Sequence, residues 1–404
     1  MPDPLRITSD ETRAAEDDRF HRLRLIGWWD QQRLARAKVL VVGAGALGNE
    51  ILKNLALLGV GQVLIVDSDR VENSNLSRSV LYRQRDNGRF KAEAAAAAAS
   101  DIYPDMRVHA YVGNVVYDLG MGVYSWADLV LGGLDNREAR LAINRACWKT
   151  GTPFIDGAIE SIQGCVRMFT PDGPCYECTM SEVDWKIVQQ RRSCNLLSRD
   201  EMEQGKTPTT PTISSVIAGV QCQEAVKHLH GLPTLAGKAW YFEGLSGDSY
   251  QVELQRKDDC YSHEMFDQIV TLNEGVAQLT ARQLLDQATE RLGPVELEFA
   301  RDMLSGLTCP QCGQTEPRFQ SLGQTRSEQA FCPHCSGVRR EISTYYKIRG
   351  DEPFLDRTLA ELGTPLWDTV IARRPDRIVG LELGGDAAAV LGPLAAGEED
   401  LQWT

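Results

Sequence analysis

Four cysteines in the second half of the chain form two Cys-x-x-Cys pairs, a spacing typical of zinc ligands. Nineteen residues separate the pairs, whose members are Cys309, Cys312, Cys332 and Cys335. The pattern predicts a zinc ribbon with a closed, structural metal site, because a catalytic zinc needs an open position. His334 is expected to face solvent. The ribbon lacks the basic face with interleaved aromatic residues that would favour nucleic acid.

A glycine-rich turn follows the first apolar run of the chain. Residues 38–42 predict a buried strand, Gly43-x-Gly45-x-x-Gly48 follows, and a helical pattern begins directly after it. These glycines let a backbone approach phosphate, and a helix N-terminus favours negative charge. Asp67, at the end of the next strand, could accept hydrogen bonds from a ribose. A nicotinamide dehydrogenase fits these residues equally well, and tight strand–helix packing without nucleotide is the plainer alternative.

Three charged residues further along separate these interpretations. Arg78, Lys91 and Asp135 follow the turn in order. A hydride-transfer site has no need of two cations and a carboxylate around its nucleotide. A site where a carboxylate attacks the α-phosphate of ATP does, because the cations offset triphosphate charge and the carboxylate holds Mg²⁺. Each residue alone could be a solvated surface charge, but the ordered set predicts ATP and Mg²⁺.

One cysteine lies in a charged stretch without apolar periodicity. Cys194 follows Arg191 and Arg192 closely, and neighbouring guanidinium groups lower the pKa of a thiol. An exposed nucleophile is expected here, and a free surface thiol is the alternative. Three other cysteines lie in apolar patterns, where buried and inert thiols are usual: Cys147, Cys165 and Cys222.

The elements that must position these residues alternate between strand and helix. Apolar runs that predict strands lie at 38–42, 62–67, 128–136 and 152–160. Helices are expected after the glycine turn, at 90–104 and at 213–231. The alternation predicts an α/β fold with a mostly parallel, doubly wound, Rossmann-like sheet.

Composition narrows the class of protein. The chain has 404 residues, enough for two to three domains, and 43 Lys and Arg against 56 Asp and Glu. The net charge of −13 repels phosphate backbones and argues against nucleic-acid partners. No apolar run reaches ~18 residues, which argues against a membrane span. The N-terminus has no hydrophobic stretch of the kind found in signal peptides, so a cytoplasmic enzyme is expected.

The segment from Val41 to Ser79 closely resembles the adenylation domain shared by ubiquitin-activating enzymes and the bacterial MoeB and ThiF proteins. The resemblance runs from about Arg19 to His263. It implies that Asp67 binds the ribose and that Asp135 coordinates Mg²⁺. The remaining implied nucleotide-binding residues are the three glycines of the turn with Asp69, Asn75, Arg78 and Lys91.

Two further features of the resemblance concern the N-terminal half. Arg19-Phe-His-Arg22 is similar to an element of the family whose last arginine reaches the γ-phosphate of ATP on a neighbouring subunit. This implies a catalytic role for Arg22 and a homodimer. Ala46 stands where the family usually has a third adjacent glycine, and a side chain this small should be tolerated.

The resemblance also assigns the remaining cysteines. The family pairs a Cys-x-x-Cys knuckle with a second one just after the adenylation domain, which implies a Cys₃His zinc site of Cys175, Cys178, Cys260 and His263. The alternative is that His263 is a surface residue and that this site binds zinc weakly or not at all. Activating enzymes carry their catalytic cysteine before the helix that resembles 214–228, which implies that Cys194 is the nucleophile. The residues around Cys194 do not match the eukaryotic pattern.

The C-terminal region resembles, more loosely, the ubiquitin-fold domain that recruits a ubiquitin-conjugating enzyme, here with Thr358-Leu-Ala-Glu361-Leu-Gly363 near its closing strands. An unrelated α+β oligomerisation domain is the alternative. The expected organisation is a flexible leader at 1–18, an adenylation domain at 19–264 with a crossover loop at 179–212, a second domain at 265–390 with a zinc-ribbon insert at 305–340, and a tail at 391–404.

Together, these patterns indicate an enzyme that activates a ubiquitin-like protein. It would adenylate the C-terminal glycine with ATP and Mg²⁺, form a thioester on Cys194, and pass it to a conjugating-type enzyme. The first alternative is a sulfur-carrier adenylyltransferase of the ThiF or MoeB kind, without the thioester. A nucleotide-binding scaffold without chemistry would not need the charged set.

Overall fold

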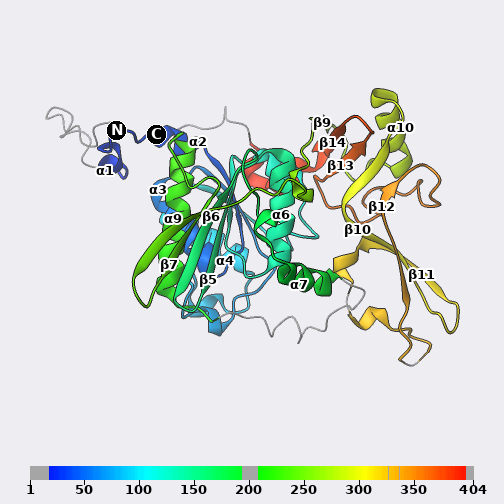
Figure 1. Ribbon diagram of the computed structural model, residues 1–404, viewed down its shortest axis with the longest axis horizontal. Helices are drawn as coiled ribbons and strands as arrows, with labels where there is room; N and C mark the ends of the chain where they lie inside the picture. The colour runs from blue at the N-terminus through cyan, green and yellow to red at the C-terminus, as the bar shows by residue number, and fades with distance from the viewer. Residues whose placement is uncertain (1–17, 193–207, 326, 336, 397–404) are drawn as a thin grey trace.

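The computed structural model describes residues 18–192, 208–325, 327–335 and 337–396 (Figure 1). Two units lie side by side, one built on an eight-stranded sheet and the other on a six-stranded sheet. Cys194 and nearly all of the expected leader lie outside the described residues.

The larger sheet has the order β3-β2-β1-β4-β5-β6-β7-β8. Pairing is parallel from β3 to β5 and antiparallel from β5 to β8. The bounds are β1 Lys38–Val42, β2 Gln62–Val66, β3 Arg107–Tyr111, β4 Leu129–Gly132, β5 Phe154–Glu160, β6 Gln163–Phe169, β7 Lys238–Glu243 and β8 Asp248–Glu253. The expected doubly wound α/β sheet is confirmed.

Helices cover both faces of this sheet (Figure 1). One face carries α3 (Ala46–Leu58), α4 (Lys91–Ile102) and α9 (Pro211–Leu229), and the other carries α5 (Gly122–Trp126) and α6 (Arg137–Thr150). In β1, Val39 and Val41 face the first layer while Leu40 and Val42 face the second. A continuous apolar strand is therefore required here, because both faces are buried.

Two short helices precede the first strand of the sheet, and a third helix, which the sequence did not predict, follows β6. These are α1 (His21–Arg24), α2 (Gln31–Arg36), and α7 (Glu182–Arg192), which lies inside the segment interpreted as an irregular loop from 179 to 212. The loop prediction is wrong for residues 182–192. Asp184 accepts the backbone N–H of Ser181 and donates its own to the Ser181 hydroxyl, so a Ser-x-x-Asp capping pattern starts the helix.

The second unit is a mixed sheet of order β11-β10-β13-β14-β9, with β12 also paired to β10. Its elements are β9 Gln268–Leu272, α10 Ala281–Leu292, β10 Glu296–Thr308, β11 Thr315–Ser321, β12 Glu341–Ile348, β13 Thr369–Arg373 and β14 Ile378–Leu383. The first and last strands, β9 and β14, pair in parallel. Helix α10 packs on this sheet through Leu284 and Ala288. The sheet and helix fit an α+β domain, and a ubiquitin-like function for it stays a prediction.

Strand β10 bends where its register shifts between Glu298 and Met303. Its first residues pair with β13 and with the end of β12, and its last residues pair with β11 and the rest of β12. The far half of β10 thus forms a small three-stranded sheet with β11 and β12. The segment expected to be a zinc ribbon extends from this sheet.

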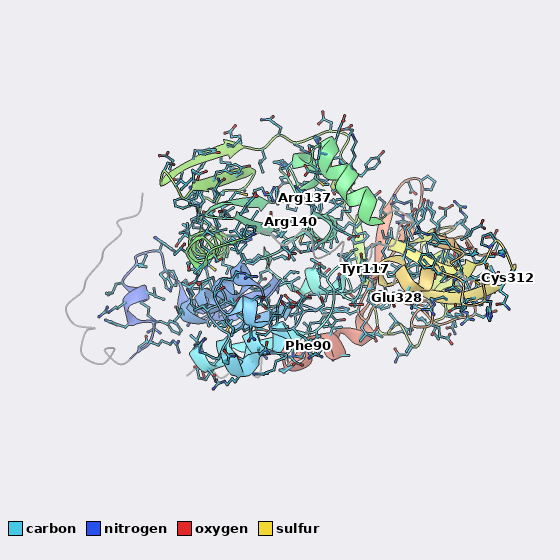
Figure 2. The ribbon with its side chains drawn as sticks, turned by 90° about the horizontal axis from the view of Figure 1, so that it is seen from below. Phe90, Tyr117, Arg137, Arg140, Cys312 and Glu328 are labelled. Carbon is cyan, nitrogen blue, oxygen red and sulfur yellow. The ribbon has the colours of Figure 1, made fainter. Side chains whose placement is uncertain are left out.

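The two units meet through buried contacts. Trp367 adopts φ +55°, which is uncommon for a residue with a side chain, and its carbonyl accepts the backbone N–H of Gly122 at 2.9 Å. Asp368 accepts the backbone N–H of Met121 at 2.9 Å and pairs with Arg301 at 3.2 Å. Figure 2 shows Tyr117 at this boundary. The second unit is therefore fixed to the loop that follows β3.

The chain then returns to the first unit. Helix α11 (Ala387–Leu391) and a following 3-10 turn, Gly392–Ala395, bury Val390, Leu391 and Leu394 in the core beneath α5 and α6. The expectation of a tail starting at 391 is wrong for residues 391–396, because those apolar side chains complete a core of the first unit. Among the described residues, no helix is both long and apolar enough to cross a membrane. A cytoplasmic location stays a prediction.

Candidate functional site

The loops after β1 and β4 lie next to each other at the carboxyl ends of two paired parallel strands. The chain leaves β1 towards β2 on one side, whereas β4 continues the sheet on the other side. Such a point of reversal is where α/β sheets bind nucleotides. The backbone N–H of Gly43 bonds to Val66 and that of Gly133 bonds to Val42, which closes the two loops onto the strands.

The three glycines of the turn differ in how closely other atoms approach them. Gly43 has φ +94°, and a Cβ there would lie 2.5 Å from the Gly133 carbonyl oxygen. A Cβ on Gly48 would overlap the Gly43 carbonyl, so these two glycines are required by the fold. No heavy atom of the described residues lies within 4 Å of a Cβ built on Gly45. Packing therefore does not explain why position 45 is a glycine, whereas the close approach of a phosphate to the backbone would explain it.

Two buried polar side chains that the sequence analysis missed hold the turn. The Asn49 amide donates to the carbonyls of Ala44 at 2.7 Å and Gly45 at 3.0 Å, and its oxygen accepts from Leu81 at 3.0 Å. The Tyr82 hydroxyl lies 2.6 Å from the Ala44 carbonyl, and burial raises the pKa of this phenol. A polar residue on the buried face of a predicted helix was the available signal for Asn49.

Asp67 touches the turn directly. One carboxylate oxygen accepts the backbone N–H of Ala44 and the other that of Asp69, each at 2.7 Å. Burial raises the pKa of Asp67, although Lys91 opposes the shift. Each oxygen keeps further acceptor capacity, so the carboxylate can also receive the hydroxyls of a ribose.

Lys91 is the cation of this group. Its ammonium lies 2.8 Å from the Asp69 carboxylate, and its side chain is only 14% exposed. Burial alone would lower the pKa of Lys91, but Asp67, Asp69 and Asp135 outweigh it and the net shift is upward. The side chain therefore keeps its positive charge beside the turn, as phosphate binding requires.

Asn75 and Arg78 lie on the segment after β2. The Asn75 side chain accepts the backbone N–H of Glu72 at 3.0 Å and is buried, so part of its role is to shape this turn. Arg78 is half-buried and donates to the Ser74 carbonyl at 2.8 Å. Contact of either residue with phosphate stays a prediction.

Asp135 is exposed at the end of the β4 loop, one residue before Asn136, which caps α6 by accepting from Ala139 at 2.8 Å. An exposed carboxylate near the Lys91 cation fits Mg²⁺, which prefers oxygen ligands and binds through one or two carboxylates plus substrate phosphates. The next residue, Arg137, donates to Asp184 of α7 at 2.6 Å. The loop thus connects the nucleotide site to the helix that leads to Cys194.

Arg22 does not lie near the charged residues around the glycine turn. It is exposed on α1, whose neighbours Phe20 and Arg19 contact Gly59 and the Ile102 carbonyl at the carboxyl ends of α3 and α4. Helix α3 has 13 residues, or roughly 20 Å at 1.5 Å per residue, so α1 lies far from the turn at its other end. Arg22 could act only on a nucleotide held by another copy of the chain.

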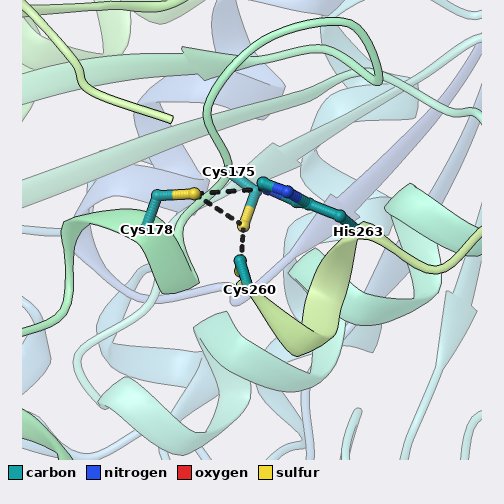
Figure 3. A group of neighbouring side chains, drawn as sticks. All are labelled: Cys175, Cys178, Cys260 and His263. Carbon is teal, nitrogen blue, oxygen red and sulfur yellow. Dashed lines mark hydrogen bonds between the residues drawn. The ribbon is translucent and has the colours of Figure 1, made fainter. Parts of the chain in front are cut away.

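Figure 3 shows Cys175, Cys178, Cys260 and His263 converging from two distant segments. Their ligand atoms all lie within 4.8 Å of one another, with Cys175 Sγ 3.7 Å from Cys178 Sγ and 3.5 Å from Cys260 Sγ. Tetrahedral ligands at about 2.3 Å from zinc would be about 3.8 Å apart, so the set fits this metal. The hydrogen bond from Cys175 lowers the pKa of the Cys178 thiol to about 4.

Residues behind this cluster tie it to both units. Glu177 accepts from Ser262 at 2.5 Å and from Arg145 of α6 at 3.1 Å. Glu264, directly after His263, pairs with Lys149 of α6 and with Arg373 of β13, each at 2.7 Å. The cluster therefore lies where the first unit joins the second.

The second expected metal set also converges. Cys309 and Cys312 lie in the turn from β10 to β11, Cys332 and Cys335 lie in the connection to β12, and their sulfur atoms are within 4.8 Å of one another. Hydrogen bonds from the Cys312 and Gln311 backbone lower the pKa of Cys309 to about 7. His334 is exposed and outside the set, as expected. The four-sulfur geometry fits zinc.

The described cysteines outside the two clusters, Cys147, Cys165 and Cys222, were all expected to be buried. Cys147 and Cys222 are buried, whereas Cys165 is half-buried on β6. Burial raises the pKa of all three thiols, so they are poor nucleophiles.

Comparison with known proteins identifies the family of the chain. A model of the ThiF family matches residues 18–262. The chain belongs to the ThiF family. This ThiF-family chain is 34% identical over 255 residues to the sulfur carrier protein adenylyltransferase of Thermus thermophilus, a match that covers 61% of the chain and 90% of that relative.

A second relative matches over a shorter region. The SAMP-activating enzyme E1 of Haloferax volcanii is 38% identical over 172 residues, which are 42% of this ThiF-family chain and 64% of that relative. The chain thus matches less than two thirds of that relative's length. Among solved structures, Escherichia coli MccB with ATP has a TM-score of 0.51 at 21% identity, covering 61% of this chain and 75% of that chain. The likeness to MccB concerns the fold.

Proposed function

We propose that the chain activates a ubiquitin-like protein at its C-terminal glycine. The observation that carries this proposal is the grouping of Asp67, Asp69 and Lys91 on the glycine turn, with Asp135 on the adjacent loop. Asp67 would receive the ribose, and Lys91 would face the phosphates together with Arg78. Two relatives named adenylyltransferase and activating enzyme support the assignment.

The first step would be adenylation. An oxygen of the terminal carboxylate attacks the α-phosphorus of ATP, the bond to the bridging oxygen of the β-phosphate breaks, and pyrophosphate leaves with the electron pair. Lys91 and Arg78 of the same chain, together with Arg22 of the partner subunit, would offset the negative charge that develops on the phosphates. Asp135 would hold Mg²⁺, which supplies further neutralisation of the triphosphate.

The second step would form a thioester. The Cys194 thiolate attacks the carbonyl carbon of the acyl-adenylate, the carbon–oxygen bond to phosphate breaks, and AMP leaves. Helix α7 supports this assignment, because it starts beside the Asp135 loop through the Arg137–Asp184 pair and ends two residues before Cys194.

The partners follow from the same proposal. The second unit would dock a ubiquitin-conjugating-type enzyme that accepts the thioester, and the two cysteine clusters would hold structural zinc. The position of Arg22, far from its own turn, supports a homodimer. The cytoplasm would be the site of action.

A second candidate is a sulfur-carrier adenylyltransferase that stops at the acyl-adenylate. The 34% identity to the sulfur carrier protein adenylyltransferase favours it. Only the use of Cys194 separates the two candidates, because adenylation is common to both.

The test combines two assays on the full chain with Mg·ATP and ubiquitin-like proteins that end in Gly-Gly. ATP–pyrophosphate exchange reports adenylation, and a non-reducing gel reports a thioester. We expect a thiol-sensitive adduct in wild type and in the control Cys222→Ala, but not in Cys194→Ala, which keeps exchange. Exchange without an adduct in wild type would favour the sulfur-carrier candidate. Absence of carrier-dependent exchange would contradict both.

A further inference from the structure

A carboxylate is fully buried next to the nucleotide loops. Asp156 lies on β5, in register with Gly132, the last residue of β4. It pairs with two guanidinium groups, Arg140 Nε at 2.9 Å on one oxygen and Arg167 at 2.5 Å on the other. Burying charged groups costs free energy unless they are paired and hydrogen-bonded in good geometry, so a cluster of three charges at this position calls for an explanation.

Arg140 connects this carboxylate to the β4 loop. While its Nε donates to Asp156, a terminal nitrogen donates to the carbonyls of Leu134 at 2.6 Å and Gly157 at 3.1 Å. Leu134 immediately precedes Asp135 in the chain. A guanidinium is a planar fork, so fixing one edge on Asp156 fixes the direction of the other donors. Figure 2 shows where Arg140 and Arg137 lie in the first unit.

Within the described residues, Arg167 makes no hydrogen bond to the β4 loop, and its side chain donates to Asp156. It comes from β6, where it pairs in register with Asp156, and its guanidinium lies 5.1 Å from the ring of Tyr176. It contributes to the same ion-pair cluster through its bond to Asp156. The two arginines therefore form a matched pair, because both contact Asp156 and only Arg140 reaches the loop.

We propose that Asp156 is a positioning residue for the nucleotide site. By orienting Arg140, it sets the place of the Leu134 carbonyl and through it the carboxylate of Asp135. The inference rests on the proposed function, in which Asp135 holds Mg²⁺ with ATP. Groups that orient a metal ligand from behind typically change metal affinity by about 10-fold to 100-fold when they are removed.

The test measures metal affinity directly. Mn²⁺ replaces Mg²⁺ as a paramagnetic probe, and its binding with a non-hydrolysable ATP analogue is titrated by electron paramagnetic resonance. Asp156→Asn, which keeps the shape but loses the charge, is expected to weaken Mn²⁺ binding about 10-fold. Arg140→Lys, which cannot span both partners, is expected to do the same. Arg167→Gln is expected to stay within about twofold of wild type.

A double mutant separates positioning from general loosening. In an Asp135→Asn background, Asp156→Asn should cause no further loss of Mn²⁺ affinity, because the ligand that it positions is already gone. Full additivity would overturn the proposal, as would equal losses in Arg167→Gln and Asp156→Asn. If Asp135→Asn weakens Mn²⁺ binding and Asp156→Asn does not, the positioning role alone would be overturned. No binding by wild type would overturn the proposed function, and this role with it.

Discussion

The indole ring of Trp148 stacks on the imidazole of His263, with ring centroids 4.4 Å apart and planes 25° apart. Trp148 lies on α6 and is almost fully buried, so it fixes the plane of the imidazole before any metal arrives. This contact helps to hold the segment of Cys260 and His263 against the segment of Cys175 and Cys178.

Metal content tests this geometry. We expect two zinc ions per chain in the purified protein and close to one in His263→Ala, since three cysteines alone leave a tetrahedral site open. Elemental analysis after dialysis gives the number. His334→Ala is the control and should keep two ions. One zinc in the wild-type chain would contradict the Cys₃His assignment.

The two glycines of the turn should respond differently to alanine. Gly48→Ala forces a Cβ against the Gly43 carbonyl and should destabilise the fold by about 1–3 kcal/mol. Gly45→Ala meets open space and should leave the melting temperature unchanged while weakening ATP binding by about tenfold or more, because the methyl group would occupy the place proposed for a phosphate. Thermal melts and nucleotide titration measure the two effects. Unchanged ATP affinity in Gly45→Ala would contradict phosphate binding at this turn.

Replacing Lys91 should lower the rate of adenylation more than it lowers the stability of the fold. Lys91→Met removes the cation that faces the turn and should reduce ATP–pyrophosphate exchange by about 100-fold or more, as loss of one transition-state donor does elsewhere. Lys53→Met is the matched control, because Lys53 also pairs with a carboxylate, that of Glu50, but on the side of α3. Equal exchange rates in the two variants would show that Lys91 does not contact the phosphates.

The boundary between the two units should depend on Asp368. Asp368→Ala leaves Arg301 and the Met121 N–H without their partner in a buried setting, and we expect a loss of about 3 kcal/mol in unfolding free energy. Asp356→Ala removes an exposed partner of Arg282 and should change stability little. Urea unfolding followed by tryptophan fluorescence compares them. Similar midpoints for both variants would mean that the boundary contributes little to stability.

Periodicity and glycine spacing predicted the first sheet and the nucleotide turn. Continuously apolar strands such as β1 are distinctive because both faces are covered, and glycine is required at positions 43 and 48 by the close approach of the backbone. The cluster of Cys309 and its partners was predictable from ligand type and spacing, whereas the cluster of Cys175 and His263 was expected only from the family resemblance.

Other features depend on contacts that a linear pattern does not contain. In the sequence Asp156 and Arg140 look like ordinary charged residues, and only the packing of α6 against β5 brings the Arg140 guanidinium to the buried Asp156 carboxylate. Helix α7 has little apolar periodicity, so its capping pattern at Ser181 was the sole local signal. The sequence after 390 is interpreted as a loose tail because the strands that it packs on, β2 and β3, lie far earlier in the chain.

Leu391 and its neighbours are anchored in the first unit, as is Glu264 at the start of the second, so the second unit is attached at both of its ends. A module on one flexible linker reaches its target with a probability set by linker length. Here linker length plays no part: a protein bound to the second unit would be presented to the nucleotide loops at one distance and one orientation. Any adjustment of that reach must come from the bound protein or from α7.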